Sequence, residues 1–505
     1  MKRFVFLFLS LLLSFQCVFA KPVDLAIDTA IAPISDAFSD IIFYPIKIFG
    51  AEIPISILWI LIGGIFFTVY FRGIAIWGFK HAISLLLKKT DTKDNGTGEV
   101  SSLQALATAL SGTIGLGSIA GVAIAISIGG PGAIFWILVG AILGMSLKFA
   151  EATLAVKFRI FNADGTVSGG PMHYISHGLT RKGLRWLGQP LAFLFAILVL
   201  PGALGCGNML QINQATQQII SITGGEKSIF YNNAWLFGLI VAIVVALIII
   251  FGIKSIARVT EKLVPFMCLL YVIIGLIVIF LNIASLPEAL VTILKEAFYP
   301  ESVYGGVAGT IIIGLRRSVQ SNEAGTGSAP IAYATVKTKE PVSQGFVSLL
   351  EPFITACICS LTALTIVVTG SYKNFTEGIS GIELTSSAFA AVLPWSPYVL
   401  AVVIILFALS TIISWAYYGQ KGWTYLFGEG KKRIVCYQVI FCAFIVAGSS
   451  INLKSIVDFT DAGMLAMAVP NMIALYILMK DIKYDLKVYC NEHNVCNKFC
   501  LSKLK

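Results

Sequence analysis

The sequence predicts an all-α, polytopic membrane protein with about eleven transmembrane helices. Of its 505 residues, 57% are hydrophobic and only 12% are charged, whereas a soluble domain carries about 25% charged residues. Apolar runs of about 20 residues, long enough to cross a bilayer, recur along the chain. Lysine and arginine gather in alternate loops between these runs. This composition cannot supply the surface of a soluble protein, so residues 55–480 are predicted to form one transmembrane domain in a lipid bilayer.

The N-terminal residues have the features of a secretory signal peptide. Two basic residues precede an apolar run that ends in a small residue, Ala20, at a suitable cleavage position. We interpret residues 1–20 as a signal peptide and residues 21–54 as an external segment. The alternative is an uncleaved additional helix.

Eleven apolar segments follow, and the charge of the loops between them predicts their orientation. Positively charged loops stay in the cytoplasm, and the basic loops alternate with neutral or acidic ones along the whole chain. This places the chain in the cell (inner) membrane, with the mature N-terminus outside and the tail, residues 481–505, in the cytoplasm. The net charge of +10 is explained by these loops, so no nucleic-acid partner is predicted. The segments lie at 55–72, 101–127, 132–156, 189–220, 233–253, 259–283, 306–337, 343–369, 396–428, 433–450 and 457–480.

Without the first segment, the remaining ten divide into two sets of five with opposite orientation. The first set begins in the cytoplasm with segment 101–127, and the second begins outside with segment 306–337. Equal halves of opposite topology are typical of transporters built as a 5+5 inverted repeat, in which the leading helices are often broken near the middle of the membrane. We therefore predict such a repeat.

Both leading segments are predicted to be broken helices. Residues 111–118 contain three glycines within six positions, and residues 321–330 contain two glycines followed by Pro330. Each glycine disfavours a helix by about 1 kcal/mol relative to alanine, and proline donates no backbone hydrogen bond. A single glycine motif is more often a sign of close helix packing, but two polar interruptions at matching places favour breaks.

A broken helix in a membrane offers binding groups. Its unwound backbone leaves amides and carbonyls without partners; free amides suit a carboxylate, and free carbonyls suit a hard cation such as Na⁺. In the first break, Gly115 and Gly117 let a ligand approach the backbone, while Thr113 and Ser118 add hydroxyl groups. We therefore predict that these four residues bind substrate beside a cation.

Segment 396–428 is expected to supply further oxygen ligands. Ser410 and Thr411 are adjacent, and Trp415 follows one turn later. A hydroxyl in a helix can instead bond to its own backbone, and a tryptophan can serve helix packing alone. Beside a broken helix, we interpret Ser410 and Thr411 as cation ligands and Trp415 as a side chain that closes the pocket.

Charges inside apolar segments are functional candidates by default. Glu323 falls in the second break, and Arg317 precedes it by about two turns. Glu323 can cap exposed amides, pair with an arginine or relay protons, and we predict a structural or gating role for both residues. Lys148 and Glu151 are three positions apart, so they are expected to pair with each other.

A row of amides in segment 189–220 admits two interpretations. The side chains lie near one face of the predicted helix, so they can line a water path or make hydrogen bonds between helices. The sequence leaves both open. The residues are Asn208, Gln211, Gln214 and Gln218.

Six motifs, in order, resemble the alanine or glycine:cation symporter family, the sodium:alanine symporters, over about residues 55–480. The resemblance implies a fold similar to the bacterial leucine transporter and Na⁺- or H⁺-driven uptake of a small neutral amino acid such as alanine or glycine. The motifs are 104–106 with 112–117, 129–136, 148–155, 169–172, 321–325 and 327–332.

Carried over by position, the resemblance also implies a set of site residues. The cation would be held by carbonyls near Ser111 and Ile114, by Ala408, and by the hydroxyl of Thr411. The substrate would lie against the first break, the second break and Trp415.

Two positions of the proposed pocket depart from the family pattern. Ser118 stands where the family usually has asparagine, and Gln320 stands before Ser321 where it usually has phenylalanine. We count all three as substrate-binding residues. A polar Gln320 in place of a ring favours a more polar small amino acid, so a cation-coupled symporter for another small polar solute is the alternative.

Other classes fit less well. An intramembrane enzyme needs a nucleophile with its base or a set of metal ligands, and the four histidines lie outside the apolar cores. A channel is also polytopic but does not need two matched breaks or a closed substrate pocket. No cofactor is predicted apart from Na⁺ as the coupling ion, and no obligate protein partner.

The predicted orientation can be tested with a reporter fused to the C-terminus. Because the lysine and arginine alternation places residues 481–505 in the cytoplasm, we expect an enzyme active only in the cytoplasm to be active there and one active only in the periplasm to be silent. Activity of the periplasmic reporter would reverse the topology and remove the basis for the inverted repeat.

Overall fold

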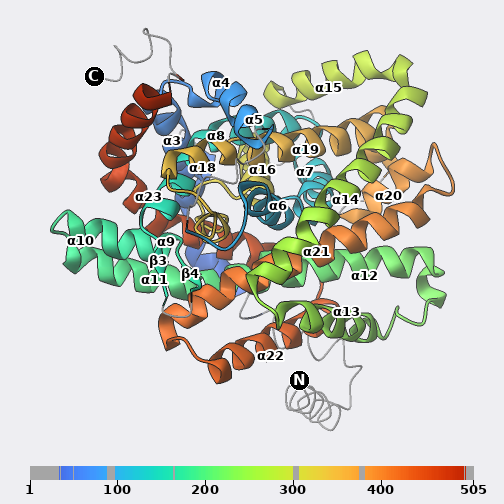
Figure 1. Ribbon diagram of the computed structural model, residues 1–505. Coiled ribbons are helices and arrows are strands. Elements are labelled where there is room, and N and C mark those ends of the chain that lie inside the picture. Colours follow the sequence, from blue (N-terminus) through green and yellow to red (C-terminus); the bar gives the residue numbers. More distant parts are fainter. Residues whose placement is uncertain are drawn as a thin grey trace.

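The chain is almost entirely helical in the computed structural model (Figure 1). The structure describes residues 33, 36–48, 51–87, 97–162, 165–299, 306–374, 381–493 and 495. The predicted signal peptide lies outside these residues. Within them, strands are confined to two short antiparallel hairpins, β1 (Pro45–Ile48) with β2 (Ala51–Pro54) and β3 (Ile160–Phe161) with β4 (Val167–Ser168). The all-α prediction is confirmed.

Each of the eleven predicted apolar segments contains at least one helix. Some of these helices are too short to be identified as a membrane span. Six helices in the described residues are long and apolar enough to cross a membrane, or up to eight if each of two bent pairs is one span. The number of spans and the inverted repeat therefore remain predictions. The six are α8 (Ala133–Lys157), α11 (Arg185–Leu204) continuing through η3 (Gly205–Met209) into α12 (Leu210–Ile222), α14 (Ile253–Leu281), α18 (Pro341–Ser348) with α19 (Leu350–Val368), α21 (Ser396–Phe427) and α23 (Leu453–His493).

The other labelled helices are bent or shorter than these six. The bent pairs are α3 (Ile55–Tyr70) with α4 (Ile74–Trp77) and α5 (Phe79–Leu87), and α6 (Ser102–Thr113) with η1 (Leu116–Ser118) and α7 (Ala120–Gly129). Three other predicted segments hold α13 (Ala234–Ile249), α16 (Gly306–Asn322) and α22 (Lys431–Gly448). Short connecting helices, most of which the sequence did not predict, are α9 (Pro171–His173), η2 (Tyr174–Gly178), α10 (Leu179–Arg181), η4 (Gly225–Lys227), η5 (Ile283–Ser285), α15 (Leu286–Phe298), α17 (Pro330–Tyr333), η6 (Ser371–Asn374) and α20 (Ile382–Ala390).

Both predicted breaks are present. α6 begins at a capping box, in which the Ser101 hydroxyl and the Gln104 side chain each accept from the other's backbone amide, and it stops at Thr113. The two halves of this helix are bent by 59°. α16 ends at Asn322, and the chain does not return to a helix until Pro330. The glycine and proline patterns therefore identified these interruptions correctly.

Two elements differ in length from the predicted segments. α17 is a single turn, and the chain after it is bound by Arg159, whose guanidinium donates to the carbonyls of Ala334 at 3.1 Å and Thr338 at 2.6 Å. α23 continues past the predicted end at residue 480. Ion pairs of Asp481 with Lys182 and Asp485 with Lys157 join its extension to the rest of the protein.

The two broken helices lie in the middle of the molecule. Figure 1 shows α6 and α16 near the centre, with α10, α15 and α22 toward the periphery. α8 packs against α16, α18 and α19, and α21 packs against α6, α11 and α14. The approach is close where glycines meet large side chains: a Cβ on Gly345 would lie 3.0 Å from the ring of Phe149. Both broken helices are therefore packed against other helices of the bundle.

Candidate substrate and cation site

The first break is held open by a side chain from another helix. Residues 114 and 115 leave the helical conformation, with ψ angles of 64° and −159°. The Leu116 amide, freed by this turn, donates to the Gln211 side-chain oxygen at 2.9 Å, while the Gln211 side-chain nitrogen donates to the Cys206 carbonyl at 2.9 Å. Gln211 thus replaces a hydrogen bond that the helix would have supplied.

Two of the predicted cation ligands, Ser111 and Thr411, meet beside this break. The Thr411 hydroxyl donates to the Ser111 carbonyl at 2.8 Å, and the Ser111 and Ser414 hydroxyls form a short hydrogen bond. Ile114 and Ala408 are also buried. Oxygen atoms from α6 and α21 therefore converge at one place, which is the chemistry that a hard cation needs.

Ser410 points elsewhere. Its hydroxyl donates to the Phe407 carbonyl of its own helix at 2.9 Å and lies 3.5 Å from the sulfur of Met267 on α14. Successive residues of a helix are rotated by about 100°, so Ser410 and Thr411 cannot both face α6. The hydroxyl that joins Thr411 there is that of Ser414.

The glycines of the first break have different surroundings. A Cβ on Gly115 would overlap the Thr411 hydroxyl and lie 2.8 Å from the Gln211 oxygen. A Cβ on Gly117 would lie 3.3 Å from the Gln320 carbonyl oxygen, which is tight but not an overlap. Gly115 is therefore required for packing against Thr411, which the sequence did not reveal, whereas Gly117 faces the second broken helix.

Gln320 lies between the two broken helices. Its side-chain oxygen accepts from Arg317 and would lie 3.3 Å from a Cβ on Gly121. Its side-chain nitrogen is buried and has no partner among the described groups. Because a guanidinium only donates, the oxygen must face Arg317, and the amide N–H groups are left available.

The other predicted substrate residues of this region make local bonds. The Ser118 hydroxyl donates to the Thr113 carbonyl at 3.4 Å, and the Ser118 carbonyl accepts from Thr362 of α19 at 3.2 Å. The Thr113 hydroxyl donates to the Ala109 carbonyl at 3.2 Å. The Ser321 hydroxyl donates to its own helix. All are buried within the first break or at the end of α16.

The second break is organised around Glu323. Its φ of +54° is uncommon outside glycine, and its carboxylate accepts from the Ser328 hydroxyl and, at 3.1 Å, from the Trp415 indole nitrogen. In the described part of the chain, Arg316 and Arg317 pair with aspartates of α23 and no arginine pairs with Glu323. Trp415 is fully buried, and a Cβ on Gly207 would overlap it, so this glycine makes room for the indole.

Glu151 and Asn471 satisfy the backbone of the same break. One oxygen of Glu151 accepts from the Gly327 amide at 3.1 Å and from the Asn471 side chain at 2.6 Å. Asn471 also donates to the Gly325 carbonyl at 2.8 Å. Residues from α8 and α23 thus take the place of the missing helical hydrogen bonds, at glycines with φ above +80°.

The expected pairing of Lys148 with Glu151 is wrong. Lys148 donates to Glu351 of α19 at 2.8 Å, with both side chains fully buried, and Tyr333 donates to the second oxygen of Glu351 at 2.6 Å. Residues three apart can meet on a helix surface, but here a carboxylate from another helix is the direct partner, and a buried ammonium needs such a partner.

A second charged cluster joins α16 to α23. Arg317 pairs with Asp461, and Arg316 pairs with both Asp461 and, at 3.0 Å, Asp458. The guanidinium of Arg316 also lies 4.1 Å from the ring centre of Phe43, ahead of the first hairpin. Arg317 also donates a hydrogen bond to the Gln320 side chain, so this cluster is linked directly to the candidate pocket.

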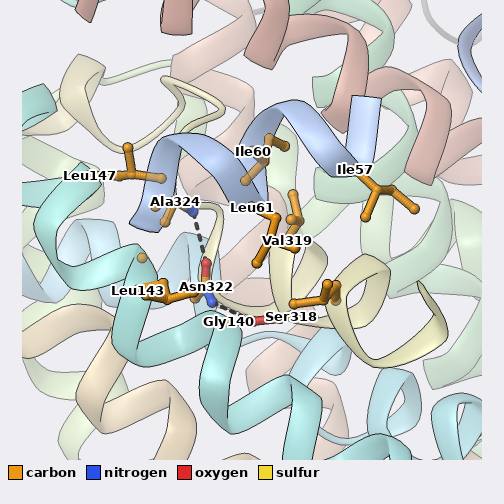
Figure 2. Close-up of a pocket in the computed structure, with 13 residues that line it drawn as sticks. Ile57, Ile60, Leu61, Gly140, Leu143, Leu147, Ser318, Val319, Asn322 and Ala324 are labelled. Atoms are coloured by element: carbon orange, nitrogen blue, oxygen red, sulfur yellow. Dashed lines mark hydrogen bonds between the residues drawn. The ribbon is translucent and has the colours of Figure 1, made fainter. Parts of the chain in front are cut away.

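A small apolar cleft lies behind the second break, between α3, α8 and α16 (Figure 2). It has about 20 Å³ of space for the centre of a water molecule, which is room for about one water. Asn322 crosses its floor, donating to Ser318 at 2.9 Å and accepting from the Ala324 amide at 2.9 Å. Its lining is mostly aliphatic, so it does not coincide with the predicted substrate site.

The row of amides on α12 and the preceding turn makes bonds between helices. Asn208 donates to the Phe441 carbonyl at 2.7 Å, Gln214 accepts from the Ile382 amide at 2.8 Å, and Gln218 donates to the Pro397 carbonyl at 3.0 Å. Of the two interpretations that the sequence left open, the structure supports interhelical bonding. Gln211 is the one member that also serves the first break.

These features define the class of protein. Two broken helices lie at the centre of a bundle of apolar helices, with buried oxygen atoms and glycines at the first break and charged groups at the second. This is the arrangement of a secondary active membrane transporter.

Comparisons with known proteins identify the family. The sodium:alanine symporter family matches residues 39–499, and the chain belongs to it. An uncharacterized transporter of Haemophilus influenzae is 38% identical over 84% of this chain and 91% of its own length. The sodium/alanine symporter AgcS of Methanococcus maripaludis is 37% identical over 86% of this chain and 94% of its own length.

A solved structure shows the fold. The crystal structure of MhsT in complex with L-phenylalanine superposes with a TM-score of 0.58 at 14% identity, and the match covers 77% of this chain and 92% of MhsT. At this identity the likeness concerns the fold alone.

Gly117→Ala separates a binding role from a packing role. The added methyl group meets the Gln320 carbonyl without overlap and favours the helical state by about 1 kcal/mol. We expect the variant to melt in detergent at the wild-type temperature and to lose at least about tenfold in affinity for amino acids, or about 1.4 kcal/mol. Early melting with normal binding would assign Gly117 to packing instead.

Proposed function

We propose that this chain is a secondary active symporter that couples inward movement of Na⁺ to uptake of a small neutral amino acid such as alanine or glycine. The observation that carries the proposal is the convergence of the Thr411 hydroxyl on the Ser111 carbonyl, 2.8 Å apart, at the break of α6. Family membership and the name of AgcS, a sodium/alanine symporter, support it.

In this proposal, α6 and α21 form the cation site together. The ligands are the carbonyls of Ser111, Ile114 and Ala408 and the hydroxyl of Thr411, and the Ser414 hydroxyl contacts the Ser111 hydroxyl beside them. Na⁺ requires several oxygen ligands at once. Its arrival would therefore fix the distance between the two helices.

The amino acid would lie between the two breaks. Gly117 and Gln320, which lie against each other, would form the wall where α16 meets the first break, with Ser321, Thr113 and Ser118 as further contacts. Trp415 would close the pocket. Its indole is fixed by Glu323, so the two side chains would act together in opening and closing it.

We assign Arg317 and Glu323 to gating. Arg317 joins α16 to Asp461 of α23, so separating these helices requires the buried pair to break. If the pair separated without water reaching it, each charge would be buried without its partner, so opening would require the pair to be solvated or paired again. The chain would lie in the cell membrane, with its N-terminus outside and its C-terminus in the cytoplasm.

Thr411→Ala tests the cation site. Losing one oxygen ligand is expected to raise the Na⁺ concentration needed for half-maximal alanine uptake by about tenfold, or about 1.4 kcal/mol, while relative rates for different amino acids stay the same. The measurement is uptake into proteoliposomes with and without a Na⁺ gradient. Ser410→Ala is the matched control, because its hydroxyl faces Met267. An unchanged Na⁺ dependence for Thr411→Ala would contradict the assignment.

One observation favours a more polar substrate as the second candidate. The Gln320 side-chain nitrogen is buried without a partner among the described groups, and an unsatisfied buried donor costs about 1–3 kcal/mol. A side-chain oxygen, such as that of serine, would satisfy it, whereas the methyl side chain of alanine would not.

Gln320→Leu distinguishes the two substrates. If the amide donates to the substrate, the variant is expected to lose at least about fivefold in affinity for serine, or about 1 kcal/mol, and to keep or gain affinity for alanine. Competition against labelled alanine gives both values. Gln438→Leu on α22, which donates to the Ile249 carbonyl, controls for the loss of a buried amide. Equal effects on serine and alanine would remove Gln320 from side-chain selection.

A further inference from the structure

The buried charges of the protein do not balance. Among the described residues, six charged side chains are buried: Lys148, Arg317, Glu151, Glu323, Glu351 and Asp461. Lys148 pairs with Glu351, and Arg317 pairs with Asp461. Two carboxylates, Glu151 and Glu323, have no ion-pair partner in the part of the chain that the structure describes. A buried carboxylate without a counter-charge is neutralised by a cation or by a proton.

The two carboxylates have different hydrogen-bond partners. Each oxygen of Glu323 accepts a hydrogen bond, one from Trp415 and one from Ser328. In Glu151, one oxygen accepts two hydrogen bonds, while the other, Oε2, is buried with no partner among the described groups. A solvated or paired carboxylate is not left with a bare oxygen in the interior.

The surroundings of Glu151 suit a proton rather than a metal ion. Na⁺ needs several oxygen ligands, whereas the groups that contact the Glu151 carboxyl are two N–H donors, from Gly327 and Asn471, which disfavour a bound cation. A proton removes the charge, and a neutral carboxyl group costs far less to bury than an unpaired carboxylate. The amide of Gly327 and the side chain of Asn471 continue to donate to the other oxygen in either protonation state.

We propose that Glu151 is a proton-binding site, separate from the Na⁺ site, and that it is protonated when the second break adopts the described conformation. This inference rests on the proposed transport function. It assigns a second, chemically different cation to the transport cycle.

The location of Glu151 links its proton to transport. The same carboxyl group that would carry the proton caps the Gly327 amide and, through Asn471, reaches the Gly325 carbonyl. If the second break opens, water reaches Glu151 and stabilises its ionised form. The closed state therefore binds the proton more tightly than the open state, and by linkage a rise in pH must weaken closure and any substrate affinity that depends on it.

Other titratable groups surround Glu151. Lys148 is on the same helix, Glu351 lies on α19, Tyr333 on α17 and Tyr174 on η2, where its hydroxyl donates to Asn471. Lys148 and Tyr333 both donate to Glu351, so that carboxylate is satisfied in its ionised form. Tyr174 is occupied by Asn471. Glu151 is thus the member of this group whose second carboxyl oxygen has no described partner and can carry the proton.

Glu151→Gln tests the proposal, because glutamine has the shape of the protonated acid and cannot ionise. Between about pH 6 and about pH 9, the wild-type affinity for alanine at saturating Na⁺ is expected to fall at least about tenfold. The affinity of the variant should change less than about twofold over the same range. Asp485→Asn, which removes a carboxylate paired with Lys157 near the surface, should retain the wild-type pH response.

Difference infrared spectroscopy gives a readout that does not depend on transport. The carbonyl band of a neutral carboxyl group, absent from carboxylates, should be present in the wild-type protein with Na⁺ and alanine and missing from the variant. If the variant fails to fold, the wild-type protein still decides: adding alanine at about pH 8 should draw protons from a weakly buffered solution.

Three results would overturn the proposal: a wild-type affinity that does not depend on pH, a Glu151→Gln variant with the wild-type pH response, or no proton uptake and no carboxyl band in the wild-type protein. An absence of Na⁺-dependent uptake at every pH would instead contradict the proposed function. The two failures are therefore distinguishable.

Discussion

The structure depends on one constraint: backbone groups exposed by two broken helices in an apolar interior must find partners. At the first break, the Gln211 side chain of α12 accepts a hydrogen bond from the Leu116 amide. At the second, Glu151 accepts a hydrogen bond from the Gly327 amide, and Asn471 donates one to the Gly325 carbonyl. Such groups cost several kcal/mol each when unpaired, so the helices that carry these side chains are fixed in place around the breaks, and the bundle is arranged about them.

The same constraint accounts for the polar residues in the core. A side chain that satisfies a break must itself be satisfied, and this extends the network outward: Asn471 is held by Tyr174, and Gln211 by the Cys206 carbonyl. The charged groups follow the same pattern, in pairs that join α8 to α19 and α16 to α23. Glu151, which has no ion-pair partner among the described residues, lies at the end of such a network, and two hydrogen bonds hold one of its oxygens in place.

The sequence was sufficient to predict local features of the chain. It was insufficient to predict which residues of different helices contact each other. Glycines and Pro330 identified both breaks, and apolar runs located the long helices, because these signals act within a few residues. The partner of Lys148, the contribution of Gln211 and the different surroundings of Gly115 and Gly117 all depend on residues from other helices. Ser410 and Ser414 show the limit well: both are hydroxyls on α21, and only the rotation of that helix against α6 distinguishes them.

α21 is the element through which the two breaks are connected. Thr411 contacts the first break, and Trp415, one turn later on the same face, contacts Glu323 in the second. The helix continues without interruption from Ser396 to Phe427, so a shift of Thr411 toward a cation must carry Trp415 with it. In the proposed function, a cation bound at α6 would therefore change the position of the indole and its hydrogen bond to Glu323. Coupling between ion and substrate would then require no long pathway, only one rigid turn of helix.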